Sequence, residues 1–156
     1  MNSKFTVLFA GTFDPFTIGH KAIVEQALKF ADTVYIGVGI NAGKHTMFTI
    51  KQRIEYIKQT FAHTDRVVVE SYDGLTVDYA KARNISCLLR GVRSLKDFEY
   101  ERQMADINRR LTGIETILLF PEPQFENISS TMVRELIGLG TDVSQFLPIS
   151  LDAISE

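Results

Sequence analysis

The stretch Gly11-Thr-Phe-Asp-Pro-Phe-Thr-Ile-Gly-His20 indicates the fold of this chain. It follows an apolar run with β propensity at residues 5–9, and an amphipathic segment begins directly after it. A strand, a tight loop and a helix start in that order leave unpaired backbone N–H groups at the positive end of the helix dipole. Such an end binds phosphate. We therefore expect a phosphate site here, with the imidazole of His20 as a further, neutral hydrogen-bond donor.

Composition sets broad limits on the class of protein. The chain has 156 residues, 45% hydrophobic and 23% charged, which predicts one globular domain over residues 1–156. A net charge of −2 argues against a general nucleic-acid binder and against a polybasic membrane surface. No apolar run approaches the roughly 18 residues that span a bilayer, and the first residues lack a signal-peptide pattern, so we expect a cytoplasmic protein.

The single cysteine, Cys87, excludes an intramolecular disulfide and makes a cysteine-rich zinc site implausible. It lies in Ile-Ser-Cys-Leu-Leu, an apolar run typical of a buried strand. We therefore interpret it as a packed, inert thiol rather than a nucleophile.

Strand and helix patterns alternate along the chain. Short β-branched or aliphatic runs predict strands at residues 5–9, 33–38, 66–70, 86–89 and 116–120. Apolar residues at helical spacing lie between them, and the last such face comprises Tyr100, Met104, Ile107 and Leu111. Capping boxes are predicted at Thr49-x-x-Gln52 and Ser94-x-x-Asp97. The order predicts an α/β fold, a single doubly wound domain with a five-stranded parallel sheet.

Loops that follow parallel strands meet at the carboxyl edge of the sheet, where such folds bind ligands. Four loops qualify, at residues 11–20, 41–48, 72–76 and 90–93. In the last of them Arg90 and Arg93 flank a glycine, so that two guanidinium groups can converge on phosphate oxygens. The carboxylates of Asp97 and Glu101 follow; they can pair these arginines, accept from a ribose, or simply lie on a solvated helix face.

Three consecutive hydroxyl residues, Ser129, Ser130 and Thr131, begin an amphipathic segment after the fifth predicted strand. One of them suffices as an N-cap. The other two, with the unpaired N–H groups of the helix start, predict a second phosphate cradle.

These blocks resemble one family. Gly11–His20, Met47-Phe-Thr, Leu89-Arg-Gly-Val-Arg93, Asp97-Phe-Glu-Tyr-Glu101 and Ile128-Ser-Ser-Thr-Met-Val-Arg-Glu135 occur in the order seen in bacterial phosphopantetheine adenylyltransferases. That family belongs to the nucleotidyltransferases with a (His/Thr)-x-Gly-His motif, and the resemblance runs from residue 9 to about residue 148. It implies a Rossmann-like nucleotidyltransferase domain that transfers the adenylyl group of ATP to 4′-phosphopantetheine. The products are 3′-dephospho-coenzyme A and pyrophosphate, in coenzyme A biosynthesis.

The resemblance also implies residue roles. His20, Lys44 and Arg90 are expected to be catalytic, and Thr12, Lys44, Thr76 and Arg90 to contact the phosphopantetheine. The residues expected around ATP are Thr12, Phe13, His20, Gly91, Val92, Arg93, Glu101, Phe125, Glu126, Asn127, Ile128, Ser129, Ser130 and Thr131.

The chemistry of the implied reaction fits these residue types. An attacking phosphate is already a competent nucleophile, so catalysis needs positioning and positive electrostatics rather than a covalent intermediate. Mg²⁺ is expected with ATP, held mainly by phosphate and water, and no dedicated protein metal ligands are predicted. The family further implies a homohexamer and feedback binding of coenzyme A, with neither a nucleic acid nor a membrane as a partner.

Three alternatives stay open at this point. An adenylyl- or cytidylyltransferase with another acceptor, such as nicotinamide mononucleotide or glycerol phosphate, usually carries His where Thr17 stands and lacks the block at residues 97–101. A nucleotide-binding sensor would bind ATP without turnover. An interaction protein would use the strand-end charges for a partner.

Overall fold

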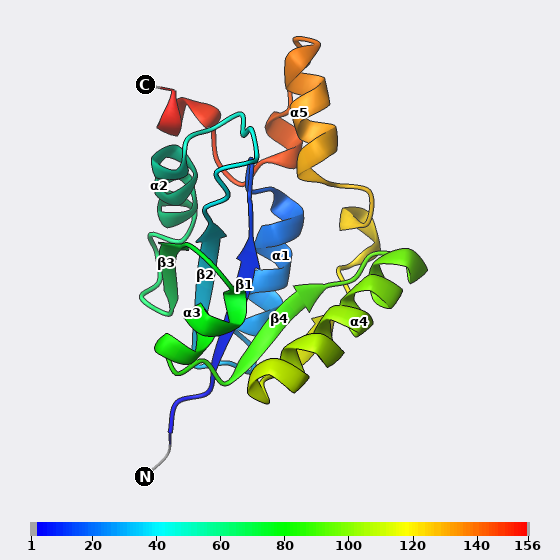
Figure 1. Ribbon diagram of the computed structural model, residues 1–156. Helices are drawn as coiled ribbons and strands as arrows, with labels where there is room; N and C mark the ends of the chain where they lie inside the picture. Colours follow the sequence, from blue (N-terminus) through cyan, green and yellow to red (C-terminus); the bar gives the residue numbers. More distant parts are fainter. Residues whose placement is uncertain (1–2, 156) are drawn as a thin grey trace.

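The computed structural model describes residues 3–155, which form a five-stranded parallel sheet with helices on both faces (Figure 1). The strands are β1 (Thr6–Gly11), β2 (Thr33–Gly39), β3 (Val67–Tyr72), β4 (Cys87–Gly91) and β5 (Glu115–Leu119). Their order across the sheet is β3-β2-β1-β4-β5, so the chain reverses its direction of winding at β1. The helices are α1 (Ile18–Ala27), α2 (Ile50–Thr60), α3 (Thr76–Ala82), α4 (Leu95–Thr112) and α5 (Ser130–Gly138). The predicted doubly wound α/β fold is confirmed.

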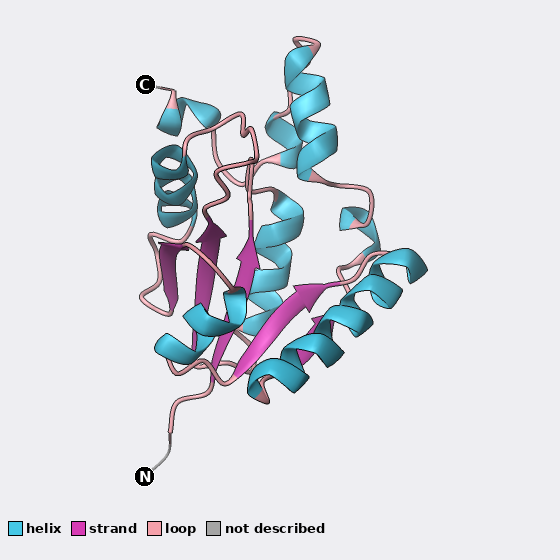
Figure 2. Ribbon diagram, in the orientation of Figure 1, coloured by secondary structure: helices cyan, strands magenta, loops and turns pink. Residues whose placement is uncertain are grey.

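Alternation along β1 divides the core between the two faces of the sheet. Val7 and Phe9 point to the face covered by α1 and α2, where they join a large cluster of buried apolar side chains. Leu8 and Ala10 point to the opposite face, where a smaller cluster includes residues of α3. In Figure 2, α3 and α4 lie in front of the sheet and α1 lies behind it. The ends of β1 and β4 therefore stay open between the two layers of helices.

The helix starts explain where the loops end. Thr49 and Gln52 form the predicted reciprocal capping box at α2. Ser94 caps α4, but the Asp97 carboxylate does not return to Ser94 and accepts instead from the backbone N–H of Arg93. Asp is one methylene shorter than the Glu of an ordinary capping box, so this second box is only half formed.

The helical face predicted at Tyr100, Met104, Ile107 and Leu111 lies on α4 but is not core. Tyr100, Ile107 and Leu111 are 59%, 47% and 60% exposed. The single residue that α4 buries is Glu101. Tyr100, Ile107 and Leu111 line a cavity that lies between α4 and the loops after β2 and β3. The predicted helix is confirmed, and its apolar face is largely exposed.

The chain after β5 returns over the carboxyl edge of the sheet. A short 3₁₀ turn, η1 (Pro123–Phe125), leads to α5, and two further turns, η2 (Ser144–Phe146) and η3 (Leu151–Ile154), complete the fold. The η3 turn packs on α2. Just before η3, the carbonyl of Ile149 accepts from the Tyr56 hydroxyl of α2 at 2.7 Å. Along residues 3–155, none of the helices is both long and apolar enough to cross a bilayer.

Candidate active site

His20 lies in the first turn of α1, at the end of the loop that follows β1. Its Nδ1 accepts from the backbone N–H of Thr17 at 3.0 Å, while the Thr17 side chain accepts from the backbone N–H of His20. These contacts form a capping box in which His replaces the usual Glu or Gln. A backbone N–H can only donate, so Nδ1 carries no proton and the neutral ring holds its proton on Nε2. The first helical turn thus fixes both the tautomer and the orientation of the ring.

The surroundings of His20 keep it neutral. The rings of Phe9, Phe13 and Phe16 surround the imidazole, with ring centroids 6.1, 5.0 and 5.2 Å away. Burial first, and then the positive charges of Arg93 and Arg90, together lower the pKa of His20 from 6.5 to about 3. At neutral pH this side chain therefore offers an N–H donor without a positive charge.

Arg90 lies near the end of β4, and three hydrogen bonds fix the orientation of its guanidinium group. Nε and Nη2 donate to the two oxygens of Glu101 at 2.9 and 2.8 Å, and Nη1 donates to the carbonyl of Ala10 at 2.7 Å. The Glu101 side chain is only 8% exposed, so the pair is largely buried on the carboxylate side. Of the five N–H donors of a guanidinium, three are used, and two are left for a ligand. Among the roles that the sequence left open for Glu101, the structure selects pairing with Arg90.

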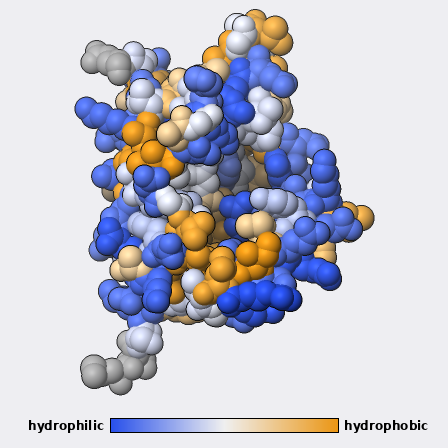
Figure 3. Space-filling model, in the orientation of Figure 1, coloured by the Kyte–Doolittle hydropathy of each residue, from blue (hydrophilic) through white to orange (hydrophobic). Residues whose placement is uncertain are grey.

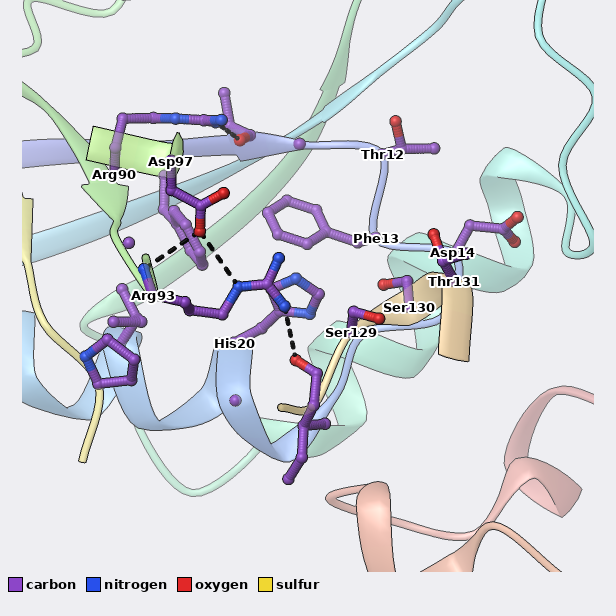
Figure 4. A pocket seen from close by; sticks show the side chains of 18 of the residues that line it. Thr12, Phe13, Asp14, His20, Arg90, Arg93, Asp97, Ser129, Ser130 and Thr131 are labelled. Carbon is purple, nitrogen blue, oxygen red and sulfur yellow. Dashed lines mark hydrogen bonds and ion pairs between the residues drawn. The ribbon is translucent and has the colours of Figure 1, made fainter. Parts of the chain in front are cut away.

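Arg93 stands beside His20 at the start of the next helix. Its Nη1 donates to the carbonyl of Ile128 at 3.1 Å, and its Nε lies 3.5 Å from Asp97 Oδ2. Figure 4 shows the side chain of Arg93 between Asp97 and the segment that carries Ser129 and Ser130, close to His20. The contact to Ile128 joins the end of β4 to the loop before α5.

A network of hydrogen bonds from buried charged side chains to backbone groups holds the first loop in place. The Asp14 side chain is 2% exposed, and its oxygens accept from the backbone N–H groups of Met47 and Phe48 at 2.8 and 2.9 Å. Arg53 donates to the carbonyls of Thr12 and Phe48 at 2.7 and 3.1 Å. The loop after β1 and the loop before α2 are therefore fastened to each other. These hydrogen bonds fix the backbone at Thr12, the residue that Lys44 contacts.

Lys44 extends from the exposed loop after β2 toward β1. Its Nζ donates to the Thr12 hydroxyl at 3.0 Å, across 32 residues of sequence. A lysine ammonium has three N–H donors, so two remain for another partner. The predicted approach of Lys44 to the end of β1 is confirmed.

The serine-rich start of α5 completes the rim. Ser129 is the N-cap, accepting from the backbone N–H of Met132 at 3.1 Å, and the Ser130 hydroxyl donates to the carbonyl of Pro15 at 2.8 Å. The backbone N–H groups of the first turn have no carbonyl partner within the helix. The predicted N-cap is confirmed, and the contact of Ser130 fastens this helix start to the first loop.

These groups line one cavity of about 450 Å³, a size typical of small-molecule sites. Of the predicted site residues it takes in Thr12, Phe13, His20, Lys44, Arg90, Gly91, Arg93, Glu101, Phe125, Ile128, Ser129, Ser130 and Thr131. Val92 is buried at 3% exposure, while Glu126 and Asn127 are exposed, and none of the three lines this cavity. The predicted convergence of distant loops at one rim is confirmed.

A second cavity, of about 680 Å³, adjoins the first and shares Thr12, Arg90 and Glu101 with it. Thr76 lies in this second cavity and not in the first. Its other walls come mainly from the loops after β2 and β3, from the start of α3 and from α4. Figure 3 shows the hollow on this face, with apolar patches along its lower border where α3 and α4 lie.

The sequence reasoning missed several residues that line the cavities. Arg134 lies on α5 and donates to the carbonyl of Asp14 at 2.8 Å and to the Thr131 hydroxyl at 3.2 Å. Its place four residues after Ser130, on the same side of a helix, was a usable signal. In the second cavity the missed residues are Ile40, Tyr72, Leu75, Tyr100, Met104, Asn108 and Thr116, among others.

Comparison with known proteins agrees with this geometry. A family model described as cytidylyltransferase-like matches residues 8–136. A phosphopantetheine adenylyltransferase of Phocaeicola vulgatus is 55% identical over 141 residues, which cover 90% of this chain and 93% of that protein. This chain belongs to the phosphopantetheine adenylyltransferase family. Two other members, from Bacteroides fragilis and Porphyromonas gingivalis, are 52% and 49% identical, each over 93% of this chain and 97% and 95% of their own lengths.

Solved structures support the fold of this adenylyltransferase family member. A bifunctional NMN adenylyltransferase/ADP ribose pyrophosphatase of Francisella tularensis superposes with a TM-score of 0.66 at 18% identity. The match covers 95% of this chain and 45% of that chain. A lipopolysaccharide core biosynthesis protein of Thermoplasma volcanium gives 0.57 at 18% identity, over 77% of this chain and 98% of that chain. At this identity the likeness concerns the fold alone.

Proposed function

We propose that this chain transfers the adenylyl group of ATP to 4′-phosphopantetheine, giving 3′-dephospho-coenzyme A and pyrophosphate. One observation carries the proposal. Two adjoining cavities meet at Thr12 and Arg90, with Lys44 beside them, so two phosphorylated reactants can be held with their phosphates next to each other. The high identity to members of the adenylyltransferase family supports the same reaction.

The reaction is a direct displacement in this account. A phosphate oxygen of phosphopantetheine attacks the α-phosphorus of ATP, a new P–O bond forms, and the bond to the β-phosphate oxygen breaks to release pyrophosphate. Lys44 and Arg90 each have two N–H donors left to orient the attacking phosphate. The Nε2–H of His20 stabilises the charge that develops on the α-phosphate, where a fixed donor in apolar surroundings acts most strongly.

The departing pyrophosphate needs a separate positive site. Arg93 and Arg134 both line the first cavity near the start of α5, together with Ser129 and Thr131. Guanidinium groups and the N–H groups of a helix start bind polyphosphate by the same physics. We assign the β- and γ-phosphates to this end of the cavity and the adenosine to the remaining space near Phe125 and Ile128.

The second cavity suits the pantetheine arm, which alternates amide and aliphatic groups. Leu75, Met104 and Leu111 supply apolar surface, and Thr76 and Asn108 supply polar groups. Within residues 3–155, the buried Thr116 hydroxyl at this cavity has no hydrogen-bond partner, and an unpaired buried hydroxyl is costly.

We propose that Mg²⁺ enters as MgATP. Among the described residues, no group of three or more His, Cys, Asp or Glu side chains is arranged to hold a metal ion. The carboxylates near the first cavity already have partners, Glu101 in Arg90, Asp97 in Arg93 and Asp14 in two backbone N–H groups. The donors that remain are cationic or hydroxyl groups, which suit phosphate and not a resident metal.

The family resemblance supports three further proposals, a homohexamer, feedback binding of coenzyme A and a cytoplasmic location. Exposed apolar residues of α4 that line neither cavity, Leu95 and Phe98, provide surface for contacts between copies. Light scattering tests the hexamer. Inhibition measured against added coenzyme A tests the feedback.

The test of the reaction is direct. The protein is incubated with MgATP and 4′-phosphopantetheine, and dephospho-coenzyme A and pyrophosphate are measured by mass and by an enzyme-coupled assay. Nicotinamide mononucleotide and glycerol 3-phosphate serve as competing acceptors. Adenylylation of phosphopantetheine and of neither other acceptor supports the proposal. Adenylylation of one of the other acceptors favours a transferase specific for that acceptor. ATP binding without any product favours a nucleotide-binding sensor.

A further inference from the structure

An aromatic cluster closes the second cavity at the end of β3. Tyr72 is the last residue of that strand, and its hydroxyl lies 2.8 Å from the Thr76 hydroxyl, at the first residue of α3. Both residues line the second cavity. Neither Tyr72 nor its hydrogen bond has a role in the reaction as described so far.

The position of the Tyr72 ring is set from both sides. On the neighbouring strand β2, a Cβ at Gly37 would lie 3.0 Å from the Tyr72 ring, a tight contact that would displace the ring by a few tenths of an ångström. A glycine inside a strand costs stability and often marks such a close approach. On the other side the Tyr79 ring stacks on Tyr72, with centroids 4.9 Å apart and an angle of 20° between the planes. The ring is therefore held between a strand backbone and a second aromatic ring.

Tyr79 is itself anchored. Its hydroxyl donates to Glu70 Oε1 at 2.8 Å, and Arg83 donates to both oxygens of Glu70, each at 2.8 Å. The hydrogen bond from Arg83 holds the pKa of Glu70 below its usual value, while burial raises the pKa of Tyr79. The carboxylate thus stays ionised and the phenol protonated at neutral pH. The hydrogen bonds and ring stacking that link Arg83, Tyr79 and Tyr72 therefore keep the same geometry around neutral pH.

We propose that Tyr72 is a positioning residue for the acceptor substrate, holding the Thr76 hydroxyl toward the second cavity to contact an amide of the pantetheine arm. The inference rests on the proposed function. Two hydroxyls have two protons between them, and their mutual bond uses one. The pair keeps one donor and several acceptor sites, so it suits either the C=O or the N–H of an amide.

The test separates the two substrates. Tyr72→Phe keeps the ring, its stacking and the fit against Gly37, and removes only the hydroxyl. We expect the KM for phosphopantetheine to rise about three- to ten-fold, the effect of one hydrogen bond, with the KM for ATP and kcat unchanged. Thr76→Val should give a similar rise, and the double variant should be no worse than the poorer single variant, because both lose the same coupled contact.

Tyr35→Phe is the matched control. Tyr35 packs against the same apolar cluster but does not line either cavity. It should leave both KM values unchanged, and thermal unfolding of all variants checks their fold. An unchanged KM for phosphopantetheine in Tyr72→Phe and Thr76→Val, an equal rise for both substrates, or fully additive effects would overturn the positioning role while the proposed function stands. A wild-type protein that forms no dephospho-coenzyme A would overturn both.

Discussion

Replacing His20 by alanine tests how the site accelerates the reaction. The structure assigns to this side chain one neutral N–H donor, with Nδ1 occupied by the Thr17 backbone and aromatic rings around the imidazole. Removing one such fixed donor to developing charge costs about 3 kcal/mol, or a fall in kcat of about 100-fold. Arg90 and Arg93 remain in the variant, so the loss should stop well short of complete inactivity.

The same substitution removes half of a helix cap, so stability needs its own control. Gln52 makes the equivalent contact at α2, where its side chain accepts from the Thr49 backbone N–H at 2.9 Å, and it lines neither cavity. Gln52→Ala removes this contact and the hydrogen bond that Gln52 donates to the carbonyl of Ile154 at 2.8 Å, so it should cost about 1–2 kcal/mol of unfolding free energy, at least as much as the cap lost in His20→Ala, with kcat unchanged. The pair of variants separates the cap from the chemistry.

The assay is steady-state pyrophosphate release with both substrates saturating, at pH 6 to 8. Because the pKa of His20 is lowered to about 3, the wild-type kcat should show no titration of this residue in that range. A folded His20→Ala protein with kcat within three-fold of wild type would refute the reasoning. So would a rise in wild-type kcat near pH 6.5 that disappears in the variant, since it would show that the imidazole titrates as a base.

Three further outcomes are expected. Lys44→Ala should weaken phosphopantetheine binding about ten-fold and ATP binding less, because its Nζ lies at Thr12 where the cavities meet, and calorimetry showing the reverse order would contradict this division of the site. Glu101→Gln removes the negative charge that holds the partly buried Arg90, so it should lower the free energy of unfolding by about 2 kcal/mol and raise the KM for phosphopantetheine. Urea unfolding and kinetics that match wild type would refute this prediction. The pKa of His20 in the folded protein lies far below 6.5, so the unfolded chain binds this proton first as the pH falls. Between pH 7 and pH 5 the free energy of unfolding of wild type should therefore fall by about 2 kcal/mol more than that of His20→Ala. Equal losses in urea unfolding would show that the imidazole is solvated.

The sequence predicted the fold well because its signals are local. Apolar runs alternate with helical spacing, and parallel topology alone brings the loops after β1, β2 and β4 to one edge. The strand boundaries differ by one or two residues; β1, for instance, ends at Gly11 and not at residue 9. Hydrogen bonding to β2 continues to that point, which hydrophobicity does not report.

Partners across space were harder to predict. The sequence left Glu101 three roles, and only the register of α4 against β4 places its carboxylate on Arg90. Periodicity shows which residues of α4 share an apolar face and not what covers that face. The second cavity depends on that face, which is why Tyr72, Met104 and Asn108 were not found from the sequence.

In the proposed reaction the two reactants meet directly at one rim, without an enzyme-bound intermediate. Among the described residues, the hydroxyls of Ser129 and Ser130 contact backbone groups and not His20, so no activated serine is in place. The measurement is the configuration at the α-phosphorus of the product made from chiral adenosine 5′-O-(1-thiotriphosphate). A single direct displacement predicts inversion, and retention would contradict it by requiring two successive transfers.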